Sequence, residues 1–343
     1  MKISTIAHRK GKLNITNNDV VQLIKEQSTN YKGDIQLALD KIKIGLNYTG
    51  FNERCWMPEQ QNLFDTIVEC AEEAISSFNP EEIKTLIYVG VGRSFLEPAT
   101  SSLIAKKLNI SPHCFDVIEA CQSWTRASFL VDGLYKGKAL TGKTLIINCE
   151  VHAQKGISGS KDFAIEQISD LEWKFPCYTM GDSITATVFE PNNEEHSWQW
   201  KNMSEIADLC YLPLPGAEDY KTEKKIDRQK NFSFYSFGKT LHQKLAPLVV
   251  DCANRLFEEN KSFKPDIVFT HTSSKRTWDN ICVQLGLSDK VYHIVHKTGN
   301  IVSASIPTAM SMAEKDGSLK RDDKVLVIFA SAGGSALAYK LSY

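Results

Sequence analysis

Three side chains that lie far apart in the sequence have the types needed for nucleophilic catalysis: Cys121, His271 and Asn300. Cys121 follows the apolar run 115–120 (FDVIEA) and precedes 126–134 (RASFLVDGL), a pattern that predicts a strand-to-helix corner. At the start of a helix, free backbone N–H groups and the helix dipole favour the thiolate form of a cysteine. Cys121 is therefore a candidate nucleophile, and the alternative is a buried structural thiol.

His271 and Asn300 each come after an apolar run that is typical of a strand, 266–270 (DIVFT) and 291–296 (VYHIVH). In doubly wound sheets the ligand site lies outside the carboxyl ends of the strands. A cysteine, a histidine and an asparagine that converge there would provide a nucleophile, its proton partner and a polar orienting group. The sequence thus predicts one site at which Cys121, His271 and Asn300 meet.

The order of predicted elements is the same in the two halves of the chain, as in an internal repeat. The elements of the first half are 63–75 (helix), 84–91 (strand), 99–110 (helix), 115–120 (strand) and 144–151 (strand); those of the second are 244–257, 266–271, 277–287, 291–296 and 324–331. Alternating strands and helices predict βαβ units, and hence a mostly parallel sheet in each half with helices on both faces. We expect an α/β protein whose halves are related by a pseudo-dyad.

The repeat also predicts where the two halves begin and end. Residues 1–190 form the N-terminal half, which carries Cys121, and residues 233–343 form the C-terminal half, which carries the histidine and the asparagine. Residues 191–232 are polar and rich in turn-forming residues, so we expect them to form a connecting cap or loop region.

Composition excludes several classes of protein. The 343 residues are 42% hydrophobic with a formal charge of -1 and no basic stripe, which argues against nucleic acid as a partner. No run of about 18 apolar residues is present and none follows the N-terminal charges, so neither membrane insertion nor export is expected. The nine cysteines include no C-x-x-C pair, which argues against zinc ribbons and predicts reduced thiols in the cytoplasm.

The order of Cys121 in EAC, His271 at a strand end, 297–310 (KTGNIVSASIPTAM) and 332–337 (AGGSAL) resembles beta-ketoacyl-acyl-carrier-protein synthase III, a branch of the thiolase superfamily. Weaker matches are spread over the rest of the chain, at 49–54 (TGFNER), 97–108 (EPATSSLIAKKL) and 180–190 (MGDSITATVFE). The resemblance implies a thiolase-like, five-layered αβαβα sandwich and a homodimer.

What the resemblance implies for the site is a Cys121 that is acylated from a thioester. His271 and Asn300 would then hydrogen-bond the thioester carbonyl of an extender unit during decarboxylative Claisen condensation. The backbone N–H of Cys121 and the glycine-rich C-terminal loop, here Gly333 and Gly334, would form the oxyanion hole. The substrates would be thioesters of coenzyme A or of acyl carrier protein, with no metal and no other cofactor.

The chain departs from the family pattern in the segment 271–276. HTSSKR stands where the family has H-Q-A-N-x-R, so Arg276 matches whereas Ser274 replaces an asparagine. Both are candidate contacts for the carrier or the substrate, and so is Trp124, which could line an acyl tunnel or simply pack in the core.

A second departure concerns the residues that grip coenzyme A in members of primary metabolism. A tryptophan and an arginine of those members are matched here by Ile44 and Tyr48. We therefore expect a relative that works in specialised, fatty-acid-derived metabolism.

Glu119, two residues before Cys121, is a candidate auxiliary base for an incoming nucleophile, or else a carboxylate at the surface or in a salt bridge. The leading hypothesis is a ketosynthase that joins an acyl group on Cys121 to a malonyl- or beta-ketoacyl-type thioester. One alternative is acyl transfer to a hydroxyl or amine, with Glu119 or His271 as the base. Another is an inactive partner subunit of a hetero-oligomeric ketosynthase.

Overall fold

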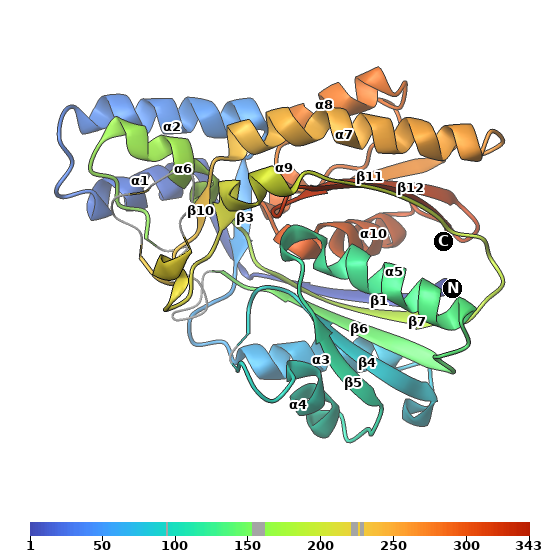
Figure 1. Cartoon of the computed structure of the whole chain (residues 1–343). Coiled ribbons are helices and arrows are strands. Elements are labelled where there is room, and N and C mark those ends of the chain that lie inside the picture. Colours follow the sequence, from blue (N-terminus) through green and yellow to red (C-terminus); the bar gives the residue numbers. More distant parts are fainter. Residues whose placement is uncertain (94, 153–161, 221–225, 227–229) are drawn as a thin grey trace.

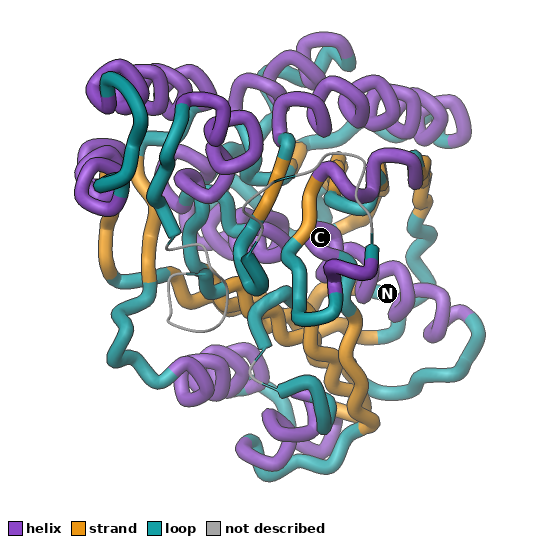
Figure 2. The backbone as a smooth tube through the Cα atoms, turned by 60° about the vertical axis from the view of Figure 1, so that its left-hand side comes forward, coloured by secondary structure: helices purple, strands orange, loops and turns teal. Residues whose placement is uncertain are grey.

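Two β-sheets lie face to face, with helices between them and on their outer faces (Figure 1). The computed structural model describes residues 1–93, 95–152, 162–220, 226 and 230–343. From the bottom of Figure 1 upward, the layers are α3 with α4, the first sheet, α5 with α10, the second sheet, and α7 with α8. Figure 2, turned by 60°, again shows helices above, below and between the strands. The predicted five-layered α/β arrangement is confirmed.

The layers are built from the following elements. The first sheet contains β1 (Lys2–Lys10), β4 (Ile83–Val89), β5 (His113–Val117), β6 (Lys143–Glu150) and β7 (Ser183–Glu190), and the second β8 (Ser197–Asn202), β11 (Ile267–Thr270), β12 (Lys324–Ser331) and β13 (Ser335–Ser342). The helices of the three helical layers are α3 (Leu63–Ile75), α4 (Thr100–Lys107), α5 (Ser123–Lys136), α10 (Ser305–Asp316), α7 (Gly238–Glu259) and α8 (Lys275–Gln284).

The two sheets have the same topology. The strand order is β1-β7-β6-β4-β5 in the first and β11-β12-β13-β8 in the second. In the first, β4 is parallel to β5 and β6, whereas β7 is antiparallel to β6 and β1. In the second, β11 is parallel to β12, whereas β13 is antiparallel to β12 and β8. Thus β8, β13, β12 and β11 correspond to β1, β7, β6 and β4, which is the pseudo-dyad that the repeat predicted. The expectation of mostly parallel sheets is wrong, because β7 and β13 run antiparallel to both of their neighbours.

The strand predicted at 291–296 is wrong. Only Val291 pairs, in one parallel bridge with Val268 at the place that corresponds to β5. The amide of Tyr292 donates to the carbonyl of Val268 at 3.0 Å, and the chain then turns into the short helix α9 (Val295–Thr298). The ring of His293, within this segment, binds Asp279 of α8, with Nε2 2.8 Å from Oδ1.

The segment predicted to connect the halves also contributes to the second sheet. β8 is its edge strand and pairs with β13, and the ring of Trp198 stacks on that of Tyr339 with centroids 4.1 Å apart. Further along, β9 (Cys210–Tyr211) pairs with β10 (Tyr235–Ser236). Residues 221–225 and 227–229 of this segment lie outside the described residues. The sequence pattern missed β8 because its pairing partner comes more than a hundred residues later.

A cap lies beside the layers, at the left of Figure 1. It consists of α1 (Asn17–Gln27), α2 (Ile35–Thr49), α6 (Leu171–Lys174), β2 (Leu13–Thr16) and β3 (Glu53–Trp56). Short 3-10 turns occur elsewhere in the chain, at Pro80–Glu82, Ile168–Asp170, Phe175–Thr179, Ser204–Leu209 and Ala217–Asp219. Thr16 and Asp19 form a reciprocal capping box that begins α1. Helices α1 and α2 bury their apolar faces in a cluster of their own, separate from the sheets.

Helix α3 shows why the periodic segments were predictable. Asn62 caps it by accepting from the amides of Phe64 and Asp65 at 3.0 and 3.2 Å. Its buried face includes Ile67 and Cys70 and packs against the first sheet. The bounds Leu63–Ile75 agree with the prediction because local capping and one apolar stripe determine them.

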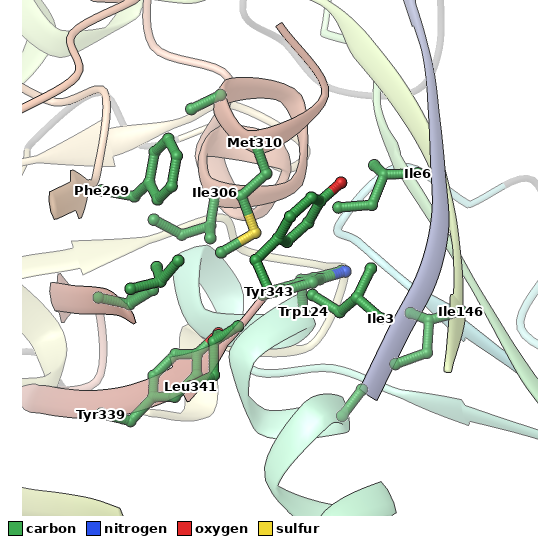
Figure 3. Packing of buried hydrophobic residues seen from close by; sticks show 14 of the residues in the cluster. Ile3, Ile6, Trp124, Ile146, Phe269, Ile306, Met310, Tyr339, Leu341 and Tyr343 are labelled. Carbon is green, nitrogen blue, oxygen red and sulfur yellow. The ribbon is translucent and has the colours of Figure 1, made fainter. Parts of the chain in front are cut away.

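The main core fills the space between the two sheets (Figure 3). Trp124 of α5 and Met310 of α10 meet side chains of both sheets there, among them Ile146 of β6 and Phe269 of β11. Because α5 and α10 share this core, their N-terminal ends are held against each other. Within the described residues, no helix is both long enough and apolar enough to cross a membrane.

Candidate active site

Cys121 lies in a 3-10 turn, Ala120–Gln122, between β5 and α5. The strand-to-helix corner is therefore confirmed. Ala120 has φ 42, in the left-handed region, so the chain turns sharply before the cysteine. The hydroxyl of Ser123 secures the turn: it accepts from the amide of Glu119 at 2.8 Å and donates to the carbonyl of Ala120 at 2.9 Å.

A matching turn, Val302–Ala304, leads into α10. Val302 has φ 49, an unusual value for a β-branched residue, which only a firmly packed surrounding can hold. The two turns contact each other at the centre of the molecule. The pseudo-dyad therefore brings the starts of α5 and α10 together.

Cys121 and Asn300 line one cavity of about 90 Å³ beside these turns. Its walls are mainly apolar and come from both halves of the chain, for example Val91 and Met180 from the first and Phe234 from the second. The predicted convergence of Cys121 and Asn300 is therefore seen in the structure. A small apolar cavity with a thiol and an amide is suited to holding a short acyl group beside a hydrogen-bond donor.

The orientation of Asn300 is set by its own backbone neighbourhood. Its Oδ1 accepts from the amide of Val302 at 3.0 Å. Its backbone N–H donates to the backbone carbonyl of Thr179 at 2.8 Å, and its backbone carbonyl accepts from the backbone N–H of Gly181 at 2.9 Å. With Oδ1 engaged, the Nδ2 amide is the group that remains to donate to a bound carbonyl or enolate.

Two glycines permit this close approach. A Cβ on Gly181 would lie 1.9 Å from the carbonyl oxygen of Thr298, and one on Gly299, which has φ 71, would lie 2.6 Å from that of Thr179. Any larger residue at either position would push the two segments apart. The motifs MGDS and GN, quoted for the family resemblance, therefore act here as the frame that positions Asn300.

His271 follows β11 and is almost fully buried, with its ring stacked on Phe329 at 4.6 Å. Burial, and then the neighbouring His242, lowers the pKa of His271 to about 3, with Asn300 opposing the shift. The imidazole is therefore neutral near pH 7. Its Nε2 is buried without a hydrogen-bond partner among the described residues, as expected of a group that awaits a substrate atom.

His271 is not among the residues that line the cavity, although it lies next to Asn300. The following residue, Thr272, ties the two loops together, since its Oγ1 accepts from the amide of Ile301 at 3.0 Å. The structure thus places the three predicted side chains in one neighbourhood. Cys121 and Asn300 line the cavity, and His271 lies next to Asn300 outside that lining.

The ionisation of Cys121 differs from the expectation. Burial, and then the nearby Cys210, raises the pKa of the Cys121 thiol, whereas the backbone N–H of Ala332 and the side chain of Ser331 act in the opposite direction. The predicted stabilisation of the thiolate by the helix start is outweighed, because desolvation penalises the charged form more than these donors favour it. At neutral pH the free protein holds a protonated thiol.

Gly333 and Gly334, the residues predicted for the oxyanion hole, directly follow Ala332 in the chain. Neither lines the cavity, whereas Ala332 does, and its N–H faces the sulfur of Cys121. Both glycines have positive φ, 81 and 78, in the turn between β12 and β13, and a Cβ on Gly334 would lie 2.1 Å from the carbonyl oxygen of Met203. Both glycines make that turn, and the N–H that faces the Cys121 sulfur is that of Ala332.

Glu119, the predicted auxiliary base, is engaged in an ion pair outside the cavity lining. Its carboxylate forms a two-point ion pair with Arg126, in which Nη2 donates to Oε1 at 2.7 Å and Nε donates to Oε2. The guanidinium of Arg126 in turn lies 3.9 Å from the ring centre of Trp200. Glu119 does not line the cavity, so the salt-bridge alternative is the one observed.

Trp124 and Ser274 are wrong as substrate contacts, because both are structural. Trp124 is fully buried in the main core, where its Nε1 donates to Thr187 at 3.1 Å. Ser274 is the buried N-cap of α8 and accepts from the amide of Thr277 at 3.3 Å. Their positions near reactive residues in the sequence gave no information on the direction of their side chains.

Arg276, in contrast, lies at the surface. It is exposed on α8, and its guanidinium lies 4.0 Å from the ring centre of Tyr48 on α2. Ile44, one turn earlier on α2, is also exposed. The positions singled out by comparison with coenzyme A-binding relatives therefore share one surface with Arg276, which remains accessible to a phosphate or an acidic partner.

Sequence reasoning missed two buried groups at the end of β6. His152 lines the cavity, and its Nε2 lies 3.4 Å from Oε2 of the fully buried Glu150. The main chain of His152 is anchored by Asp182, whose Oδ1 accepts from its amide at 2.6 Å. The available signal was the polar pair E-x-H directly after the apolar run 144–149, at the carboxyl end of a strand.

The described residues contain no candidate metal site. Within the described residues, no three His, Cys, Asp or Glu side chains are grouped so that they could hold an ion. All nine cysteines are free thiols.

Comparison with known families finds similarity to beta-ketoacyl-[acyl-carrier-protein] synthase III. Residues 261–343 match the family described as 3-oxoacyl-[acyl-carrier-protein (ACP)] synthase III C terminal. The chain is 24% identical over 292 residues to the beta-ketoacyl-[acyl-carrier-protein] synthase III of Clostridium botulinum strain 657, covering 83% of this chain and 85% of that protein. It is 27% identical over 299 residues to the enzyme of the same name from Campylobacter jejuni, covering 84% and 86%.

Solved structures share the whole fold. Xanthomonas campestris OleA, in a form with bound lauric acid and lauroyl-CoA, superposes with a TM-score of 0.81 at 16% identity, covering 99% of this chain and 98% of that one. The 3-oxoacyl-[acyl-carrier-protein] synthase III of Aquifex aeolicus gives a TM-score of 0.78 at 19% identity, covering 100% and 99%. The fold is thus thiolase-like over its full length.

Proposed function

Because the chain is a beta-ketoacyl-acyl-carrier-protein synthase III-like protein of the thiolase superfamily, we propose that it takes an acyl group from a thioester onto Cys121 and condenses it with a second thioester. The observation that carries the proposal is the shared cavity of Cys121 and Asn300 where the two halves meet. The products would belong to specialised, fatty-acid-derived metabolism.

The acylation step uses groups on both sides of the sulfur. Attack of the Cys121 sulfur on a thioester carbonyl forms a tetrahedral oxyanion, which needs donors in place before the reaction. The N–H of Ala332 faces the sulfur and is one such donor. Loss of a donor of this kind typically lowers the rate about 10²–10³-fold.

The condensation step requires a donor for the enolate of the extender unit. Nδ2 of Asn300 is available because Oδ1 is held by Val302. A neutral His271 next to it can donate a second hydrogen bond, and its low pKa keeps it neutral. With a malonyl-type extender the enolate arises by loss of CO₂, so no base has to remove a proton from carbon.

Acyl transfer to a hydroxyl or amine, with Glu119 or His271 as the base, is less well supported. Glu119 is engaged by Arg126, and a histidine with a pKa of about 3 is a weak base. The hypothesis of an inactive partner subunit remains, and it makes the opposite prediction for acylation of Cys121.

Intact-protein mass spectrometry tests the acyl-enzyme. The full chain is mixed briefly with coenzyme A and acyl-carrier-protein thioesters of varied chain length, alongside Cys121→Ala. We expect one acyl increment in the wild type and none in the variant. Cys114→Ala is the matched control, since Cys114 is the other partly exposed thiol, and it should keep the increment. No increment with any donor would favour the inactive-partner hypothesis.

Asn300→Ala separates the two steps. We expect acylation of Cys121 to persist, whereas condensation falls about 10²–10³-fold, as for the loss of one enolate donor. Product analysis with a malonyl thioester measures the second step. Undiminished product would refute the role of Asn300 while leaving the acyl-enzyme intact.

For the donor, we propose that Arg276 and Tyr48 contact the phosphate-bearing arm of coenzyme A or of a carrier protein. The exposed guanidinium, placed over the Tyr48 ring, can bind a phosphate through parallel hydrogen bonds. Arg276→Ala should raise KM for the thioester more than it changes kcat. A variant with both constants unchanged would exclude this surface.

We also propose a homodimer, formed through the outer edge of β5. Among the described residues this edge has no strand partner, and Ile118, an exposed apolar residue, directly follows the strand. Such an edge is a template for pairing with a second copy. Light scattering on Ile118→Lys tests this, since a lysine in the interface should give monomers. With nine free thiols, we expect the protein to act in the reducing cytoplasm.

A further inference from the structure

Glu150 and His152 form a second polar group at the cavity that the proposed roles of Cys121, His271 and Asn300 do not use. Glu150 is the last residue of β6, the strand that corresponds to β12 in the other half, and His152 follows two residues later. His152 lines the cavity together with Cys121 and Asn300, and its Nε2 lies 3.4 Å from Oε2 of Glu150. A carboxylate this close to an imidazole can orient the ring.

Glu150 is held firmly although it is fully buried. Its Oε1 accepts from the hydroxyl of Ser303 and, at 3.4 Å, from the amide of Ser303. Its Oε2 accepts from the amide of Val91 at 3.4 Å. These donors come from both halves of the chain, so the carboxylate is fixed at the interface beside the turn that carries Cys121.

Acylation needs a base that the three predicted residues do not provide. Burial keeps the Cys121 thiol protonated, and Glu150 adds to this because a negative charge nearby disfavours a thiolate. His271, with its pKa lowered to about 3, is suited to donate a proton but not to accept one. Something else at the cavity must therefore take the thiol proton when the sulfur attacks.

We propose that His152, oriented by Glu150, is the general base that takes the proton of the Cys121 thiol during acylation. This rests on the proposed acyl-enzyme function. The sulfur of Cys121 forms a bond to the carbonyl carbon of the donor thioester, whose own C–S bond then breaks with both electrons remaining on the departing sulfur. His152 returns the proton to that sulfur, so the carrier leaves as a thiol and the charges balance.

The arrangement of charge favours this transfer. A proton taken up by His152 is balanced by the Glu150 carboxylate, 3.4 Å from Nε2, so that no unpaired cation is left in the cavity. In this assignment His152 is a catalytic residue, and Glu150 acts through it as a positioning residue.

The experiment measures two rates on the full chain by intact-protein mass spectrometry. One is alkylation of Cys121 by iodoacetamide, and the other is its acylation by the coenzyme A thioester that labels the wild type best. We expect His152→Gln to lower both rates about 10²-fold or more, the usual contribution of a general base. Glu150→Gln should lower both by a smaller factor, because a neutral amide still orients the ring.

His293→Gln is the matched control. His293 also binds a carboxylate, with Nε2 2.8 Å from Oδ1 of Asp279, but it does not line the cavity. This variant should keep both rates within about twofold of the wild type. Equal losses in His293→Gln and His152→Gln would overturn the proposal, because they would show a general effect of removing a paired histidine.

His152→Ala guards against a merely structural effect. Added imidazole should restore part of its alkylation and acylation rates, because the vacated space adjoins the cavity. A slow variant that imidazole does not rescue, or a folded His152→Gln with wild-type rates, would overturn the assignment. A wild type that is never acylated would instead contradict the proposed function, so the two failures are distinguishable.

Discussion

In the first half of the molecule, the turn before α5 places Cys121 against the cavity, whereas the matching turn before α10 places Ser303 against the Glu150 carboxylate. Each turn begins with a left-handed residue, Ala120 or Val302. The two backbones are alike, yet Cys121 lines the cavity whereas Ser303 is buried and hydrogen-bonded to Asn148 and Glu150. Duplication of a fold therefore supplies two equivalent positions, and their neighbours decide which one becomes reactive.

The strand ends differ in the same way. In the second half, the residue after β11 is His271, whereas the residue after β4 in the first half is Gly90. The second half thus contributes the hydrogen-bond donors and the first half contributes the thiol. The site exists only where the two halves meet, because each supplies what the other lacks.

The largest expected effect comes from exchanging the residues of the two turns. In the double variant Cys121→Ser and Ser303→Cys, we expect acylation to fall about 10³-fold or more, since the nucleophile is removed and its replacement is sealed off. Ser303 is buried and bonded to Glu150 and Asn148, so a thiol there cannot reach a thioester. Peptide mapping after incubation with the donor thioester measures this, and an acyl group on the introduced thiol would contradict the comparison.

The next effect concerns stability in acid, and it involves both halves. Burial lowers the pKa of His8 to about 4, that of His242 to about 4 and that of His271 to about 3. In the unfolded chain a histidine titrates near 6.5, so below that pH the unfolded state binds more protons than the folded one. Stability is full above about pH 6.5 and falls toward pH 4, by about 1.4 kcal/mol per pH unit for each histidine.

Urea unfolding at pH 7, 6 and 5 checks this. His271→Gln should have a shallower loss of unfolding free energy than the wild type, by about 2 kcal/mol between pH 7 and pH 5. His8→Gln tests the first half in the same way, and the exposed His113→Gln is the control that should keep the wild-type slope. Equal slopes in all four proteins would show that burial of these rings is not linked to folding.

A smaller effect is expected from relieving the two left-handed residues. Ala120→Gly should change the free energy of unfolding by no more than about 1 kcal/mol, because relief of strain and the entropy of glycine oppose each other. Val302→Gly should lower it by about 1–2 kcal/mol, since it also loses a buried valine side chain. Urea unfolding measures both, and a stabilised Val302→Gly would mean that strain dominates this turn.

The smallest effect is expected for Glu119→Gln. The partly exposed ion pair with Arg126 contributes about 1 kcal/mol or less. Acylation of Cys121 should stay within about twofold, in contrast to Glu150→Gln, because only Glu150 acts on a residue of the cavity. A tenfold loss of acylation or product in Glu119→Gln would restore Glu119 as a catalytic candidate.

Local pattern was enough to predict much of the fold. The periodic segment at 63–75 is α3 and the apolar run at 324–331 is β12, as expected, because one buried face or one buried strand determines each. The repeated order of elements also predicted the pseudo-dyad, and with it the meeting of Cys121 and Asn300. That inference needed only the order of elements, because parallel strands in a wound sheet end on the same side.

Elements that depend on a distant partner were not predictable. β8 forms a strand by pairing with β13. Residues 291–296 do not form a strand, and His293 within them binds Asp279 of α8. Neither partner is visible in the local pattern.

By itself, the sequence determined the alternation of strands and helices, the repeat of that order in two halves and the three polar residues at the strand ends, since these follow from periodicity and from residue type. Only the tertiary structure decided that Glu119 binds Arg126, that Trp124 belongs to the core, that Ala332 faces the sulfur and that His152 shares the cavity. The reason is physical. Periodicity reports which face of an element is buried, but the burial and partners of one polar group are set by side chains that the fold brings from far along the chain.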